Sequence, residues 1–102
     1  MQQEINWIMA MEGILENQTV LVHELNQLLD QIEETHSNLV KLWTYYGSEE
    51  FHHDVEMHQQ GKFPDDLDRL VLSEDGIYNV ITGHYQTSIR MIELATKKLK
   101  DY

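Results

Sequence analysis

The sequence contains no cysteine, and its 102 residues include one proline and five glycines. Without cysteine the chain forms neither a disulfide nor a cysteine-ligated zinc site, and it has no cysteine nucleophile. The single proline, Pro64, leaves long stretches in which a helix can continue. No apolar run approaches the ~20 residues that span a bilayer, and we recognise no signal peptide. We therefore expect a cytoplasmic protein that makes no contact with membranes.

Basic residues are also scarce. Seven Lys and Arg residues stand against eighteen Asp and Glu residues, so the formal net charge is −11. Residues 1–60 carry most of this excess, with eleven acidic residues and one basic residue, Lys41. Proteins that bind nucleic acids or anionic membranes present a basic face, so we expect neither partner. An acidic face favours a basic protein partner instead.

Apolar residues make up 41% of the chain, which is typical of one folded domain of this length. In the first half they follow the alternating steps of three and four that place side chains on one side of a helix. This stripe comprises Ile8, Met11, Leu15, Gln18, Val22, Leu25, Leu29, Ile32, His36, Leu39, Trp43 and Tyr46, and it is widened by Ile14, Leu21, Leu28 and Leu42. We predict one helix over about residues 3–46, with its weakest point at the polar segment 16–19.

Turn and capping residues divide the remainder of the chain. Gly47 can adopt the left-handed conformation that ends a helix, and Ser48 can cap a short helix over about residues 49–60. Residues 61–72 form a turn, and a final helix covers about residues 74–100.

These elements predict an all-α fold in a single domain over residues 1–102. A long N-terminal helix leads through a short helical connector into a long C-terminal helix. Ser73 caps this last helix, and its final turn is rich in lysine, which favours a helix C-terminus. We expect the last helix to pack back on the first as a helical hairpin or bundle, which dimerisation could complete.

The C-terminal half carries sequence features of a known family. They are YYGSEEF at 45–51, GKFPDDLDRLVLSED at 61–75, and the pattern Tyr78, Arg90, Met91, Glu93, Ala95 and Thr96. The chain resembles a bacterial family of small acidic helical proteins known only as a domain of unknown function. It departs from that family in having Phe51 in place of tryptophan and Gly76 in place of alanine. The resemblance implies a helical fold in a bacterial cytoplasm, and it assigns no activity or functional residue.

Aromatic and acidic residues gather around the turn at Gly47 and Ser48, where we place the candidate partner-binding site. Tryptophan and tyrosine are enriched at the energetic centres of protein interfaces, and carboxylates can steer a basic partner. The candidate residues are Trp43, Tyr45, Tyr46, Glu49, Glu50, Phe51, Asp54 and Glu56. The same aromatic residues could instead close one end of a small core. The leading hypothesis is a non-enzymatic interaction module for a basic protein, such as an acidic inhibitor or an immunity-type protein.

A histidine-rich segment supplies an alternative. Its candidate ligands are His52, His53, Asp54 and His58, which suit Zn²⁺ or another divalent transition metal. Their spacing matches no standard zinc pattern, and a solvated helix surface that carries several histidines is the preferred explanation. We therefore expect no cofactor, with a metal site as the alternative.

Features that indicate an enzyme are missing from the sequence. None of the serines lies in a nucleophile elbow, and no glycine-rich phosphate loop is present. A further alternative is a structural homodimer in which the stripe of residues 8–46 pairs with its own copy.

Overall fold

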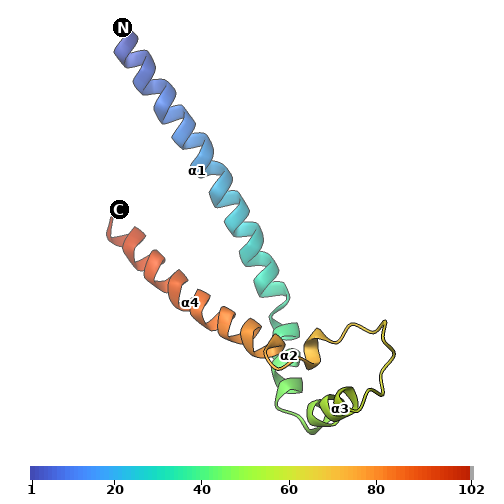
Figure 1. Ribbon diagram of the computed structural model, residues 1–102. Coiled ribbons are helices and arrows are strands. Elements are labelled where there is room, and N and C mark those ends of the chain that lie inside the picture. Colours follow the sequence, from blue (N-terminus) through green and yellow to red (C-terminus); the bar gives the residue numbers. More distant parts are fainter. Residues whose placement is uncertain (102) are drawn as a thin grey trace. The chain divides into compact units, whose positions relative to one another are not determined.

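The computed structural model describes residues 1–101, and over that range it consists of helices joined by turns (Figure 1). The elements are α1 (Gln2–Glu34), α2 (His36–Tyr46), α3 (Glu49–Gln59), the short 3₁₀ helix η1 (Leu70–Leu72) and α4 (Gly76–Lys100). The predicted all-α class, with a long helix toward each end, is confirmed. The chain divides into two compact units, one from Met1 to Ser37 and one from Asn38 onward.

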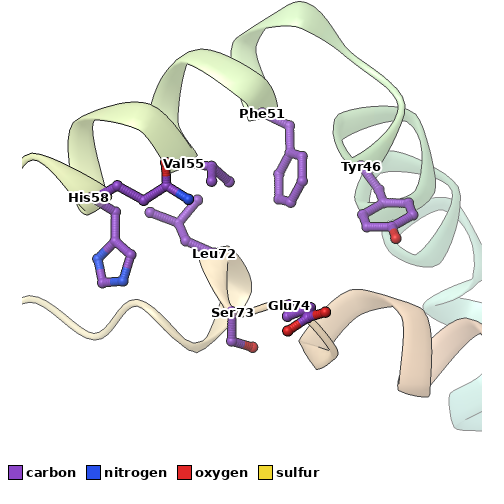
Figure 2. A pocket seen from close by; sticks show the side chains of 8 residues that line it. Tyr46, Phe51, Val55, His58, Leu72, Ser73 and Glu74 are labelled. Atoms are coloured by element: carbon purple, nitrogen blue, oxygen red, sulfur yellow. The ribbon is translucent and has the colours of Figure 1, made fainter.

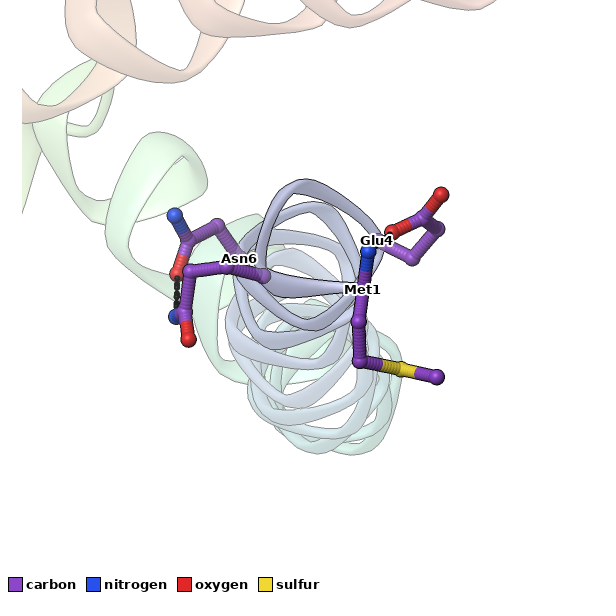
Figure 3. A network of polar contacts seen from close by, with 4 residues as sticks. Met1, Glu4 and Asn6 are labelled. Atoms are coloured by element: carbon purple, nitrogen blue, oxygen red, sulfur yellow. Dashed lines mark hydrogen bonds and ion pairs between the residues drawn. The ribbon is translucent and has the colours of Figure 1, made fainter.

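The first unit is essentially the 33-residue helix α1. The helix passes through the polar segment 16–19 without interruption, so the predicted weak point lies elsewhere. Thr19 lies within the helix, and its hydroxyl donates a 2.7 Å hydrogen bond to the Leu15 carbonyl. At the first turn the Met1 ammonium lies 2.7 Å from a Glu4 carboxylate oxygen, and Gln2 donates to Asn6 (Figure 3). Every residue of this unit is exposed.

The predicted continuous helix over residues 3–46 is wrong at one residue, Thr35. This residue has φ −98° and ψ 3°, and it separates α1 from α2. Its backbone N–H and its hydroxyl both donate to the Gln31 carbonyl, at 3.0 and 2.7 Å. A β-branched residue with a competing hydroxyl, following two glutamates at the negative end of a helix, weakens helical geometry there.

The turn between α2 and α3 depends on Ser48. Its hydroxyl donates to the Tyr45 carbonyl at 2.6 Å and accepts from the Phe51 backbone N–H at 3.2 Å. Ser48 is therefore the N-cap of α3, as the sequence predicts. The left-handed conformation predicted for Gly47 is wrong: among the described residues Gly61 has a positive φ, of 68°, and Gly47 does not. Gly61 follows α3, where the Lys62 N–H donates back to the Met57 carbonyl and closes the helix end.

The core of the second unit forms where η1 packs against α3 and against the start of α4. Leu72 is 8% exposed and Ile77 is 2% exposed, and these two are the buried apolar side chains of the described chain. Ser73 connects the elements, because its hydroxyl donates to the Leu70 carbonyl and accepts from the Gly76 N–H. α4 begins at Gly76, two residues later than predicted.

None of the helices in residues 1–101 combines the length and the apolar composition that crossing a membrane requires. The predicted packing of the last helix on the first, and the predicted dimerisation, stay predictions.

Candidate functional site

Three aromatic rings meet at the capped turn between α2 and α3. The ring centroids of Tyr46 and Phe51 lie 5.3 Å apart, and those of Tyr45 and Phe51 lie 5.4 Å apart in an edge-to-face arrangement. Trp43 extends the group with a 6.0 Å centroid distance to Tyr46. Distances of this kind are favourable for aromatic pairs. The short turn that Ser48 caps brings these rings together, since only Gly47 and Ser48 separate the end of α2 from the start of α3.

A hydrogen bond between Tyr45 and Asp54 fixes the far side of this turn. The Tyr45 hydroxyl donates to Asp54 Oδ2 at 2.6 Å, and both side chains are partly buried. Burial, followed by the hydrogen bond to the Asp54 carboxylate, raises the pKa of Tyr45 to about 12. The carboxylate of Asp54 therefore ties α3 to the end of α2.

Beside the aromatic group lies a cavity of about 430 Å³ (Figure 2). It is lined by Tyr46, Phe51, Val55, His58, Gln59, Leu72, Ser73 and Glu74. Tyr46 comes from the end of α2 and Phe51 from the first turn of α3, while Leu72 reaches it from η1. Four of the eight lining residues are aromatic or aliphatic and the other four are polar, with the Glu74 side chain along one edge. The cavity falls in the usual size range of ligand pockets, about 300–1,000 Å³.

The structure separates the predicted partner-binding residues into four groups. Tyr46 and Phe51 line the cavity, Tyr45 and Asp54 hold the turn, and Trp43 is 53% exposed beside Tyr46. The acidic residues Glu49, Glu50 and Glu56 are exposed on α3 and do not line the cavity. Glu50 borders a separate shallow depression, which is lined also by Val40, Lys41, Thr44, Tyr45 and Ser48.

The histidine-rich segment lies along α3. At 3.6 residues per turn, His52 and Glu56 project from one side of the helix, and Asp54 and His58 from nearly the opposite side. Asp54 accepts the Tyr45 hydrogen bond, and the His52 ring packs against Phe51 with centroids 6.1 Å apart. Within residues 1–101 no group of three or more His, Asp or Glu side chains is arranged to hold a metal ion.

The cavity also contains residues that the sequence did not point to as a site. Leu72, Ser73 and Glu74 belong to the LVLSED sequence at 70–75, and Val55 and Gln59 complete the α3 side. The one available signal was the family-like character of residues 61–75, which contains three of them. That signal did not indicate that these residues would face Tyr46 and Phe51.

These features define a small acidic all-helical protein whose second unit holds an aromatic-lined cavity. The chain belongs to the family described as a domain of unknown function, DUF4298, whose sequence profile matches residues 8–94. The matched range contains every residue that lines the cavity. No curated protein and no solved structure matches the chain.

Proposed function

We propose that this protein is a non-enzymatic interaction module of the cytoplasm that binds a basic protein. In this proposal an apolar side chain of the partner enters the cavity beside Tyr46 and Phe51. The observation that carries the proposal is the cavity itself, which combines four aromatic or aliphatic side chains with a carboxylate, Glu74, along its edge. An aliphatic or aromatic residue next to lysine or arginine has the matching chemistry.

The composition of the cavity supports binding by insertion of an anchor residue. Interfaces gain most of their affinity from a few apolar anchors that fill well-formed pockets near the centre of the contact. Tyr46 and Phe51 are already held by the capped turn, so little side-chain ordering remains to oppose binding.

The charge of the surroundings supports a basic partner. Glu49 and Glu50 are exposed in the first turn of α3, and Glu74 stands at the cavity edge. Carboxylates around an apolar anchor site raise the association rate of a basic protein more than they raise its affinity. An acidic inhibitor or an immunity-type protein would work in this way. The absence of cysteine is consistent with a cytoplasmic location.

The proposal is tested by site-specific crosslinking in cells. A photoreactive amino acid replaces Glu74 at the cavity edge or, as a control, Tyr85, which is 69% exposed on α4 and does not line the cavity. We expect one protein to crosslink at position 74 and not at position 85. Crosslinking of the same proteins at both positions, or of none, would contradict the proposal.

A matched pair of charge variants then tests the site with the purified partner. Gln59 lines the cavity, whereas its neighbour Gln60 does not. We expect Gln59→Arg to weaken binding at least about tenfold, since it fills the cavity edge and repels a basic partner, and Gln60→Arg to have a much smaller effect. Reversal of Glu49 and Glu50 to lysine should lower the association rate at low salt. Equal effects of both arginine variants would place the contact elsewhere.

A further inference from the structure

The apolar stripe of α1 is a second surface, distinct from the cavity. It consists of Ile8, Met11, Ile14, Leu15, Leu21, Val22, Leu25, Leu28, Leu29 and Ile32, which we call the α1 stripe. Their exposed fractions range from 39% at Leu29 to 62% at Leu15. In a heptad labelled from Ile8 as position a, these residues occupy positions a, d and g, and Gln18 is the one polar residue at an a or d position between Ile8 and Ile32.

A helix with this much uncovered apolar surface needs a partner to be stable in water. Isolated helices gain too little from hydrogen bonding alone, and most helical stability in proteins comes from packing an apolar face. α1 also contains Gly13, which lowers helix stability. Seven carboxylates without any lysine or arginine in residues 1–37 add repulsion along the helix.

We propose that a second copy of α1 covers the α1 stripe in an antiparallel arrangement, with the two-fold axis at the height of Val20. In antiparallel pairs a residue at position a lies opposite a residue at position d. With the axis at Val20, Ile8 meets Ile32, Met11 meets Leu29, and Leu15 meets Leu25 of the second copy. When the stripe is reversed, apolar residues therefore meet apolar residues, except where Gln18 meets Val22. A different partner protein would require no such symmetry about the middle of the helix.

The flanking positions favour the antiparallel direction over the parallel one. In the antiparallel register the g positions of the two copies lie on the same side of the pair, so Leu28 and the second copy's Leu21 each lie within two residues of the points opposite Ile14 and Leu21. In a parallel pair each g residue faces an e residue instead, which places Leu28 against the carboxylate of Glu33. Carboxylates lose solvation against an apolar neighbour, so the antiparallel pair has the lower cost.

The size of the stripe fits a stable interface. Covering an aliphatic side chain removes roughly 60–100 Å² from water, so the ten residues on each copy remove roughly 1,200–2,000 Å² in total. This range equals that of standard protein interfaces.

The natural absence of cysteine makes the register directly testable in the full chain. Leu15→Cys and Leu25→Cys are purified separately and oxidised alone or as a mixture. The antiparallel register places Cys at 15 next to Cys at 25 of the other copy, whereas each residue lies ~15 Å from its own copy. A disulfide requires Cα atoms closer than about 7 Å. We expect a mixed disulfide dimer when the two variants are combined, and little crosslinking in either variant alone. As a control, Leu15→Cys is mixed with Gln27→Cys, which places its cysteine on the outer face, and we expect little crosslinking there.

Rapid crosslinking of each variant with itself would show a parallel pair and overturn the proposal. Sedimentation equilibrium of the wild type provides the second measurement. A chain that stays monomeric up to ~100 μM would show that something other than a second copy covers the stripe. We expect Val22→Glu to raise the dimer dissociation constant at least tenfold, while Gln27→Glu, with the same added charge on the outer face, changes it little. None of these residues lines the cavity, so failure here leaves the proposed function untouched.

Discussion

The two units of the chain use the same kind of amphipathic helix, but they treat its apolar face differently. Residues 1–37 are all exposed, whereas the unit from Asn38 onward buries Leu72 and Ile77. The second unit contains a capped turn at Ser48 and a loop that returns η1 to α3 and α4. Helical periodicity therefore establishes which face of a helix is apolar. Whether a unit buries that face depends on a loop that brings another element of the same unit against it.

The largest expected effect tests the core of the second unit on one helix. Ile77 is 2% exposed and Ile92 is 67% exposed, and both belong to α4. We expect Ile77→Ala to lower the free energy of unfolding by about 2–5 kcal/mol, because it leaves a cavity in the core. Urea denaturation of the full chain measures the loss.

The matched control is Ile92→Ala, for which we expect a change below ~0.5 kcal/mol, because an exposed side chain has little packing to lose. An equally large loss at Ile92 would mean that this face of α4 is covered in solution. The contrast between buried and uncovered apolar faces would then apply to α1 and not to α4.

Glycine substitutions in α4 give the next largest effect, with opposite signs at two positions. A Cβ added at Gly76 would lie 2.5 Å from the Leu70 carbonyl oxygen and 2.8 Å from Ser73 Oγ, so Gly76→Ala should destabilise the protein by about 1–3 kcal/mol. A Cβ at Gly83 meets nothing within 4 Å, so Gly83→Ala should stabilise by about 0.5–1 kcal/mol. Thermal unfolding monitored by circular dichroism compares the two variants.

A stabilising Gly76→Ala would show that η1 does not pack closely on the start of α4. That result would remove Leu72 from the core and would make the second unit resemble the first. The close approach of Leu70 and Ser73 to position 76 explains the glycine there, where the family resemblance leads us to expect alanine.

The sequence allowed prediction of those features that depend on neighbouring residues. The α3 cap at Ser48 and the proximity of Tyr46 to Phe51 both arise within six residues of chain, where capping chemistry is local. The helix break was less predictable, because Thr19 and Thr35 make the same bond to the carbonyl four residues back and only Thr35 interrupts the helix. The difference lies in the two glutamates that precede Thr35.

The cavity could be predicted only in part. Its α2 and α3 walls follow from the short turn, but Leu72 and Glu74 come from a segment more than twelve residues beyond α3. No periodicity specifies where such a loop returns, so these residues could not be placed from the sequence. The aromatic residues were visible as candidates because tryptophan and tyrosine are conspicuous, whereas a leucine and a glutamate among many are not.

The smallest expected effect tests the polar contact that holds the turn in the second unit. Tyr45→Phe removes the hydroxyl that donates to Asp54, so we expect a loss of about 1 kcal/mol at neutral pH. Tyr78→Phe is the matched control, because Tyr78 is 55% exposed, and there we expect a change below ~0.5 kcal/mol. Equal losses of unfolding free energy in the two variants would show that the hydrogen bond to Asp54 does not stabilise the fold.

The pH dependence of the free energy of unfolding tests whether the Tyr45–Asp54 hydrogen bond stabilises the fold, whatever the size of its contribution. The pKa of Tyr45 is raised to about 12 in the folded state, so folding favours the neutral phenol, which alone can donate to the Asp54 carboxylate. This stabilisation is fully present below the unfolded pKa of about 10, and it is lost as the pH rises from about 10 to 12. The difference in unfolding free energy between wild type and Tyr45→Phe should therefore shrink over that window and stay constant between pH 6 and 9. A difference that grew with pH would mean that the phenolate is the better-held form, and that Asp54 does not accept the hydrogen bond that ties α3 to α2.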